Sequence, residues 1–347
     1  MSVKKVALLC LGAYGVVSAV LFFAPLVVSD PMKKLKKKFP YPVTVIAHRG
    51  GSSIGPENTL YTFEKALKEQ HVDMLEMDVH QSKDGKIVVI HDGSLLRTCG
   101  SDIKISDVVV GQSPDETLPQ SLRRIPIFYN AYGRELLDRP FEADDGVPVN
   151  SSTRVCLLTE VFERLRGVPL HIDIKEDSYA FVKSVLDLIE TYHRETITFV
   201  GSSNSRNKKH FKQYFKSCSK EKRDRYRLFG NEADFWKTHF LYRTGLLPFV
   251  SLDYDVFSIP IHIGSMRKEC ENDYGKYLPI LVAGCLTSPL LWRYLQARGI
   301  AVVAFVFNDE TDIREAANFP VNGLMTDYPI KLSKIIQSIN HKLNILN

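Results

Sequence analysis

Eight short apolar segments, most of them separated by helical segments, constrain the fold of this 347-residue chain more than any other feature. The apolar segments are rich in β-branched residues, as strands are, and the segments between them place apolar residues three and four apart, as amphipathic helices do. The predicted strands are 43–48, 74–79, 87–91, 169–175, 196–202, 226–230, 300–307 and 321–326. The predicted helices are 59–70, 156–166, 178–193, 208–217, 287–298 and 309–317. This alternation predicts an α/β fold, a (β/α)8 TIM-type barrel whose active site lies at the carboxyl ends of the strands.

The chain divides into four predicted parts. They are an N-terminal membrane anchor, a basic juxtamembrane linker, the barrel and a C-terminal tail, at residues 1–30, 31–42, 43–335 and 336–347. The composition, 44% hydrophobic and 24% charged, is that of a globular protein able to bury a full core. Residues 93–155 are rich in Ser, Asp, Pro and Gly and lack a sustained period, so we predict an insertion there, after the third strand.

An apolar run at residues 6–28 has only Tyr14 and Ser18 as polar interruptions. About 20 apolar residues suffice to cross a bilayer, whereas the apolar core of a cleaved signal peptide has about 7–15. We therefore predict one uncleaved transmembrane helix. Lysines are denser after this run than before it, which predicts that the barrel lies in the cytosol. We expect the anchor to lie in the endoplasmic reticulum or another internal membrane. The lysines could also bind anionic lipid headgroups.

The first predicted strand ends abruptly in His48, Arg49 and two glycines. Such an ending delivers polar side chains into a loop where the backbone bends tightly. Glu57 and Asn58 follow, just before the helix predicted at 59–70. A short histidine-arginine-glycine match alone arises often by chance. The prediction of a functional site therefore depends on the residues of the strands that come next.

The second predicted strand alternates acidic and apolar residues, so Glu76 and Asp78 share one face. Two carboxylates that close are costly unless they share a proton or bind a hard divalent cation, for which oxygen ligands suit Mg²⁺ or Ca²⁺. The next strand runs into His91. His48, His91, Asp173, Lys175 and Asn308 all fall near predicted strand ends.

These motifs, in this order, resemble those of the glycerophosphodiester phosphodiesterase family, over roughly residues 43 to 335. The segments that carry the resemblance are His48-Arg49-Gly50, Glu57-Asn58-Thr59, Glu76-x-Asp78, Val89-Ile90-His91-Asp92, His171-Ile172-Asp173-Ile174-Lys175 and Asn322-Gly323-Leu324-Met325-Thr326-Asp327-Tyr328-Pro329. Each motif alone is weak, and jointly they are specific. The chain departs from the family in having Asp173 where many members have Glu, and a phenylalanine-led segment before Asn308 where many have a tryptophan-led one.

The resemblance implies how the candidate residues divide the work of hydrolysing a phosphodiester. His48 and His91 would form the acid/base pair, since imidazole titrates near neutrality. One Mg²⁺ or Ca²⁺ ion would be held by carboxylates, with a histidine within reach of it, the candidates being Glu76, Asp78, Asp173 and His91. Substrate contacts would come from Arg49 and Lys175 on the phosphate oxygens, from Glu57 and Asn58 near the glycerol, and from Asn308.

Within the family the chain most resembles the membrane-anchored lysophospholipase D branch. That branch would cleave lysophospholipids to lysophosphatidic acid and a free headgroup. Two alternatives remain, namely a glycerophosphodiesterase of water-soluble glycerophosphodiesters and a non-catalytic lipid-binding membrane protein. A net charge of +5 is mild, and we predict no nucleic-acid or protein partner.

Three features have a plainer interpretation beside the functional one. The apolar segment 235–266 could be a rim around the site, a shallow membrane contact or ordinary core. Asp173 and Lys175 could be a simple ion pair. Asp327 precedes Tyr-Pro and is predicted to serve turn formation rather than catalysis.

Overall fold

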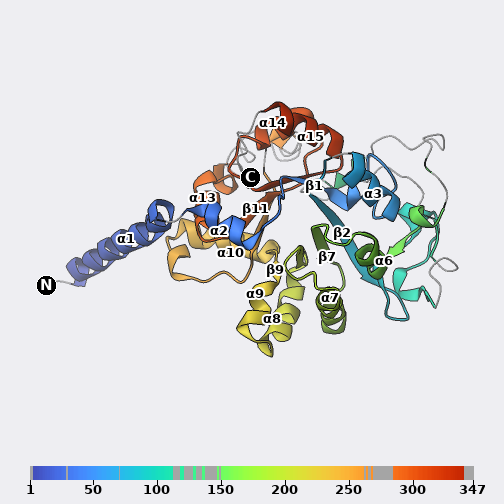
Figure 1. Ribbon diagram of the computed structural model, residues 1–347. Helices are drawn as coiled ribbons and strands as arrows, with labels where there is room; N and C mark the ends of the chain where they lie inside the picture. Colours follow the sequence, from blue (N-terminus) through green and yellow to red (C-terminus); the bar gives the residue numbers. More distant parts are fainter. Residues whose placement is uncertain are drawn as a thin grey trace.

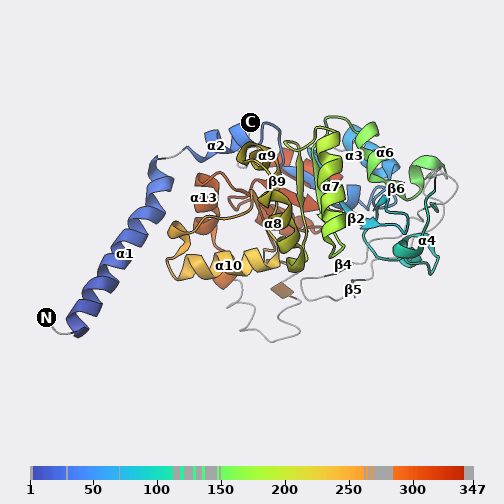
Figure 2. The same cartoon turned by 90° about the horizontal axis from the view of Figure 1, so that it is seen from below.

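Eight parallel strands form a nearly closed barrel surrounded by helices in the computed structural model of the protein (Figure 1). The structure describes residues 3–28, 30–69, 71–111, 118–120, 128–129, 135–136, 147, 150–261, 263–264, 267–268 and 284–339. A long helix, α1 (Val3–Val28), projects from one side of the barrel in both ribbon views (Figures 1 and 2). The predicted (β/α)8 fold is confirmed.

Around the barrel, each strand is hydrogen-bonded in parallel to its neighbours. The order is β1 (Val45–Ala47), β2 (Met74–Gln81), β7 (Leu170–Ile174), β8 (Thr198–Gly201), β9 (Arg227–Leu228), β10 (Val256–Ile259), β11 (Ala301–Ala304) and β12 (Gly323–Thr326), which returns to β1. The ring closes between β9 and β10 through a bridge from Phe229 to Val256, where the Gly230 amide donates to the Val256 carbonyl at 2.8 Å.

The prediction of a barrel strand at 87–91 is wrong. β3 (Ile87–Val89) pairs antiparallel with β2 and with β6 (Cys156–Leu157), outside the ring. β2 is long enough to run past the barrel rim, and a turn at residues 82–86, with Gly85 at a φ of 81°, folds the chain back along it. The missing eighth strand is β10, which lies in the apolar segment 235–266, so Phe257 and Ile259 of that segment are core.

Helices cover the outside of the ring. They are α3 (Leu60–Glu69), α6 (Leu158–Arg164), α7 (Tyr179–Thr191), α8 (Lys208–Lys216), α9 (Lys220–Arg225), α10 (Glu232–Arg243), α13 (Pro289–Ala297), α14 (Glu310–Ala316) and α15 (Pro329–Ser338). Ser178, Asn231 and Asp309 cap α7, α10 and α14 by accepting backbone N–H bonds, as N-cap residues do. All six predicted helices are present.

The predicted insertion follows β3, and its described part holds short elements only. These are α4 (Leu96–Cys99), the 3₁₀ turns η2 (Ile105–Asp107) and η3 (Ser151–Thr153), and the pair β4 (Phe128–Tyr129) and β5 (Glu135–Leu136). Three further 3₁₀ turns lie in the barrel, η1 (His48–Gly50), η4 (Ser205–Asn207) and η5 (Leu247–Phe249). Most of 112–149, the tail from 340 onward and positions 262, 265 and 266 of the apolar segment lie outside the described residues.

The segment predicted as a linker contains a helix that belongs to the barrel core. Asp30 caps α2 (Pro31–Lys38) by accepting from the Lys33 amide at 3.1 Å. Leu35 and Phe39, four residues apart, are fully buried among inward-facing side chains of the strands, including Ile46, Met74, Phe199, Val303 and Met325. Because β1 starts just after this segment, α2 closes the amino-terminal end of the barrel.

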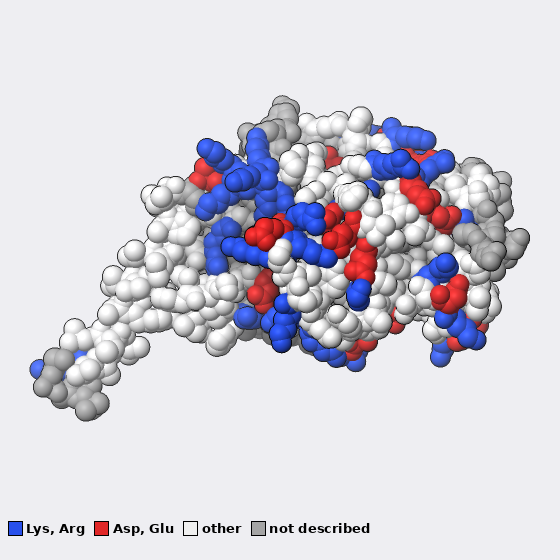
Figure 3. All heavy atoms as spheres, turned by 60° about the horizontal axis from the view of Figure 1, so that its bottom comes forward, with Lys and Arg blue, Asp and Glu red and all other residues white. Residues whose placement is uncertain are grey.

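Helix α1 is apolar along almost its whole length, and Tyr14, Ser18 and Phe22, four residues apart on one face, contact the body. Figure 3 shows α1 as a rod whose Lys side chains lie only near its N-terminal tip. Phe22 stacks on Tyr294 of α13 at 4.3 Å between ring centroids. Ser18 donates to the Gly245 carbonyl at 2.6 Å, and Tyr14 donates to the Thr244 carbonyl. Residues 5–28, whose most apolar stretch has a mean hydropathy of 2.4, form the one helix, among the described residues, that is long and apolar enough to cross a membrane.

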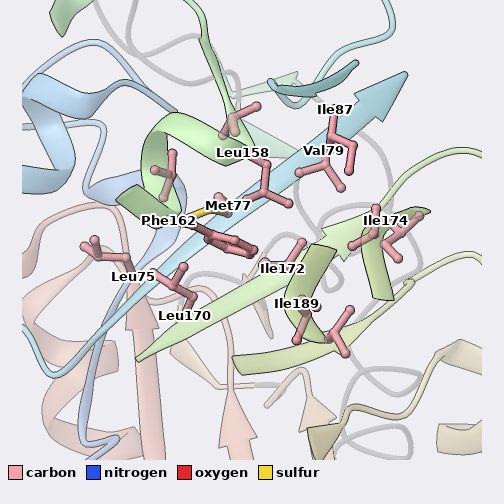
Figure 4. Close-up of a cluster of buried hydrophobic side chains, with 14 of the residues drawn as sticks. Leu75, Met77, Val79, Ile87, Leu158, Phe162, Leu170, Ile172, Ile174 and Ile189 are labelled. Carbon is pink, nitrogen blue, oxygen red and sulfur yellow. The ribbon is translucent and has the colours of Figure 1, made fainter. Parts of the chain in front are cut away.

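Apolar and polar residues alternate along β2 and β7, so the two kinds of side chain lie on opposite faces of these strands (Figure 4). One face packs against the side chains of α6 and α7, through Leu75, Met77, Val79, Leu170, Ile172 and Ile174. Since successive strand residues point to opposite faces, Glu76, Asp78 and Asp173 are directed into the barrel. The register pairs Asp78 with Asp173, which brings the predicted carboxylates together.

One buried histidine of α10 should make stability depend on pH. His239 packs between Phe235 and Phe257, and among the described residues neither ring nitrogen has a hydrogen-bond partner. Burial, with a smaller contribution from the Arg243 charge, lowers its pKa to about 4. The unfolded chain binds this proton below about pH 6.5, so stability should fall by up to about 3 kcal/mol between pH 6.5 and 4, and not above pH 7.

The measurement is the free energy of unfolding by urea at pH 7.5 and pH 4.5 for the protein and for His239→Phe. We expect the variant to lose less stability on acidification. An equal loss in both proteins would show that His239 does not cause the effect.

Candidate active site

Polar side chains from separate strands meet at the carboxyl end of the barrel. Every one of the predicted residues lies on, or within a few residues after, β1, β2, β3, β7 or β11, apart from the loop residues Glu57 and Asn58. Those two join the site because the Asn58 amide donates to the Arg49 carbonyl at 2.9 Å, which folds the loop back over β1. The hairpin of β2 and β3 returns His91 to the level of Asp78, so a histidine from outside the ring reaches the same end.

His48 is held by a buried carboxylate. Its Nδ1 lies 2.8 Å from Oδ1 of Asp327, and its Nε2 lies 3.9 Å from Glu76. Burial lowers the pKa of His48, but the charges of Asp327 and Glu76 outweigh this and leave it raised. Burial raises the pKa of Asp327, but the nearby His48 and Arg49 charges bring it below its usual value. The pair thus fixes the ring with Nε2 directed toward Glu76.

Asp327 therefore does more than form a turn. It is fully buried just after β12, and it also accepts from Ser52 Oγ at 2.8 Å and from Asn308 Nδ2 at 2.9 Å. Asn308 returns the bond, because its Oδ1 accepts from the Asp327 amide at 2.9 Å. Asn308, predicted as a substrate contact, thus uses both ends of its side chain to hold the partner of His48.

Glu76 and Asp78 lie side by side in a buried setting but in different electrostatic surroundings. Glu76 accepts from the Arg49 amide at 2.7 Å and has no ion pair with Lys or Arg among the described residues. Burial and the neighbouring Asp78 raise its pKa to about 8. Asp78 is bound by Lys175 at 2.8 Å and by Asn58 at 3.2 Å. Burial raises the pKa of Asp78, but the charges of Lys175, His91 and Arg49 outweigh this and hold it well below the usual value.

Lys175 bridges two carboxylates. Its ammonium lies 2.7 Å from Asp173 as well as 2.8 Å from Asp78, so the predicted ion pair is present and extends to β2. Burial lowers the pKa of Lys175, but the two carboxylates raise it by more. The net pKa lies above the usual value, so the ammonium stays charged. Asp173 also accepts from the amide and hydroxyl of Ser203, both at 2.9 Å, which fixes its position.

Arg49 is placed by an unusual backbone conformation. Its φ of 51° lies in the left-handed region, and its side chain is buried. Nη1 donates to Glu57 at 3.2 Å, Nε lies 3.7 Å from Asp78, and that Nε–H has no hydrogen-bond partner among the described residues. Asn58 also has a positive φ, 57°, and its buried Oδ1 has no partner in the described part of the chain. The site thus keeps an unused donor and an unused acceptor near Asp78.

His91 is held by a second carboxylate that the sequence did not single out. Its Nδ1 lies 2.7 Å from Asp92, and Arg97 of α4 donates to Asp92 through Nε at 2.7 Å. The same guanidinium donates twice to Glu57, each time at 2.7 Å. Burial lowers the pKa of His91, which the charges of Asp78 and Asp92 only partly offset. Arg97 therefore links the insertion to the loop that carries Arg49.

The donor set suits a hard cation. Among the described residues no three His, Cys, Asp or Glu side chains already converge as a complete metal site. Glu76 and Asp78 nevertheless offer adjacent carboxylate oxygens, Asn58 Oδ1 is an unpaired buried oxygen, and the raised pKa of Glu76 reflects negative charge that lacks compensation. All-oxygen ligands of this kind fit Mg²⁺ or Ca²⁺.

Comparison with known proteins agrees with the geometry. The model of the glycerophosphoryl diester phosphodiesterase family matches residues 48–331, from His48 to the first turn of α15. The chain belongs to this family. It is therefore a phosphodiesterase of the glycerophosphoryl diester type, and the resemblance drawn from the motifs is confirmed.

Relatives and solved structures extend the match. The mouse protein named lysophospholipase D GDPD1 is 32% identical over 95% of this chain and 96% of its own length. Mouse lysophospholipase D GDPD3 is 27% identical over 93% and 89%. A phosphodiesterase of Oleispira antarctica, solved with the product sn-glycerol-3-phosphate, shares the fold with a TM-score of 0.55 at 20% identity, over 86% of this chain and 97% of that one.

Arg97 should matter to this phosphodiesterase although it lies in the insertion. Lysine keeps the charge but cannot bind Glu57 and Asp92 together with two-pronged geometry. Loss of a partner that orients an active side chain typically costs about 10–100-fold, so we expect kcat of Arg97→Lys to fall by about that factor. Arg164→Lys, at the exposed pair with Glu64, is the matched control and should keep wild-type kcat. A variant Arg97→Lys with full kcat would contradict the positioning role.

Proposed function

We propose that the protein is a metal-dependent lysophospholipase D, which cleaves lysophospholipids to lysophosphatidic acid and a free headgroup. The observation that carries this is the 32% identity, over 95% of the chain, to a relative named lysophospholipase D. The apolar helix α1, packed on the barrel itself, supports it, because a substrate with one acyl chain resides in membranes and a water-soluble diester does not.

In this proposal the two histidines move the protons. His48 and His91 carry the same arrangement, a carboxylate at Nδ1 that leaves Nε2 to take or give a proton at the substrate. Arg49 and Lys175 bind the phosphate oxygens, exchanging part of their bonds to Glu57, Asp78 and Asp173. Glu76, Asp78 and Asp173, with His91 within reach, would hold one Mg²⁺ or Ca²⁺ ion, which would neutralise charge on the phosphate. Glu57 and Asn58 would lie near the glycerol of the substrate, and Asn308 would act by holding Asp327.

We also propose a location on an internal membrane such as the endoplasmic reticulum, with α1 as a single-pass anchor and the barrel in the cytosol. The lysines after α1 support this orientation. The contacts of Tyr14, Ser18 and Phe22 with the body support an anchor over a removable leader, because a leader needs no fit to the folded domain.

Mass spectrometry of products tests the function directly. Detergent-solubilised protein is incubated with lysophosphatidylcholine and, separately, with glycerophosphocholine, each with Mg²⁺, Ca²⁺ or chelator, beside His91→Ala. Metal-dependent lysophosphatidic acid from the first substrate supports the proposal. Glycerol phosphate from the second alone would replace it with a soluble-substrate glycerophosphodiesterase, and activity equal in His91→Ala would refute the assigned chemistry.

A further inference from the structure

Exposed apolar side chains of the body gather beside α1. Outside α1, nine large apolar side chains of the described residues are exposed. Five of these nine belong to α13, to η5 and the loop before it, and to α10, whose Tyr242 ring packs on Phe22 of α1; they are Trp236, Phe240, Leu246, Phe249 and Leu290, here called the apolar ledge. A random scatter of surface hydrophobics needs no explanation, but a cluster in one sector does.

Helix α10 has two apolar faces, of which one is unpartnered. Phe235, His239 and Leu241 point into the core. Trp236 and Phe240, four residues apart on the other face, are 53% and 62% exposed. An exposed Trp and Phe four residues apart leave one apolar face of α10 open to the surroundings of the protein.

The ledge is continuous with α1. Phe249 stacks on Tyr14 at 6.2 Å between ring centroids, and Tyr14 and Ser18 donate to the carbonyls of Thr244 and Gly245, between α10 and η5. Both residues lie in the middle of the 24-residue apolar segment of α1, not at its end. Any environment that surrounds this half of α1 therefore also reaches η5 and the end of α10.

The distribution of charged residues on the surface also agrees with an apolar surface that continues from α1 onto the body. Figure 3 shows surface without Lys, Arg, Asp or Glu continuing from the α1 rod onto the adjoining part of the body, while charges lie farther along it. In Figures 1 and 2 alike, α1 leaves the barrel on the side of α10 and α13.

We propose that the apolar ledge is a second membrane contact, inserted into the bilayer beside α1. The occupant is lipid, because the ledge shares a packed boundary with the helix proposed to lie in lipid, and because Trp is enriched at the level of the headgroups. The inference rests on the proposed anchoring by α1 but not on the proposed substrate. The barrel is thus seated on the bilayer rather than held away from it.

Tryptophan fluorescence can test this contact without an added label, because the chain contains two tryptophans. Trp236 is on the ledge, and Trp292 of α13 is fully buried. The full-length protein and Trp236→Phe are reconstituted in vesicles of phosphatidylcholine with and without bromine on the acyl chains. The difference between the two proteins gives the emission of Trp236, and Trp236→Phe alone gives that of Trp292, so no core residue has to be replaced.

We expect bromolipid to lower the Trp236 emission roughly twofold or more, because an interfacial Trp lies within reach of the upper acyl chain, and to leave Trp292 nearly unchanged. Iodide in the buffer should quench Trp236 weakly. Strong iodide quenching without bromolipid quenching, in protein that floats with the vesicles, would overturn the ledge contact and leave the anchor standing. Protein that does not float with vesicles would overturn both.

Discussion

Replacing His48 with alanine should lower kcat by about 10²–10⁴-fold, the usual contribution of a positioned acid or base, and should change KM little. The reason is geometric: Asp327 fixes the ring so that Nε2 faces Glu76 and the interior of the site. The measurement is kcat and KM on the substrate cleaved by the wild type. His193→Asn is the control, because this exposed histidine has a φ of 54° that asparagine also tolerates.

The variant Asp327→Asn tests whether Asp327 acts by positioning His48 or only by stabilising the fold. The amide keeps the size of the side chain but cannot hold His48 as a carboxylate does, so we expect kcat to fall while the unfolding midpoint changes little by comparison. If His48→Ala retains more than about a tenth of wild-type kcat, the histidine does not carry the proton transfer that this site requires.

Replacing Asp78 with asparagine should abolish the response to divalent metal and lower activity by at least about 10³-fold, since metal neutralisation of a phosphate is worth several kcal/mol. Lys175 would keep its partner Asp173, so the barrel should still fold. For the wild type, chelator should remove activity, and Mg²⁺ or Ca²⁺ should restore it and raise the thermal midpoint. At a metal concentration 100 times Kd that stabilisation is about 2.7 kcal/mol.

Asp253→Asn, at an exposed acid that pairs with Lys212 away from the site, is the matched control and should keep both the activity and the thermal response. A persistent metal-dependent midpoint in Asp78→Asn would remove Asp78 from the ligand set. Chelator without effect on wild-type activity would remove the metal from the proposal altogether.

The sequence was sufficient where a residue's position follows from local periodicity. The alternation of β2 predicts that Glu76 and Asp78 share a face, and the structure pairs Asp78 with Asp173 across β7. It was insufficient where partners come from distant segments. A short apolar run reads the same in a parallel or antiparallel strand, so β3 was misassigned to the ring. Strand β10 was hidden in a longer apolar segment.

The partners of the two histidines were missed for different reasons. Asp327 stands before Tyr-Pro, where turn chemistry explains it locally, although its place after the last strand was the signal to use. Asp92 directly follows His91, and Arg97 lies in a segment without periodicity, so only the folded chain brings it to Glu57. In α2, five lysines concealed Leu35 and, directly after the helix, Phe39, which lie four residues apart and are both buried.

Helix α2 determines how the enzyme would search for substrate. A flexible tether lets a domain range over a distance that grows as about 5–6 Å times the square root of its length, and raises the encounter rate with anything inside that radius. Here α1 ends at Val28, α2 begins at Pro31, and Leu35 is already inside the barrel. With α1 as the proposed membrane anchor, the enzyme would have almost no reach of its own, and lipid substrates would have to come to it by lateral diffusion.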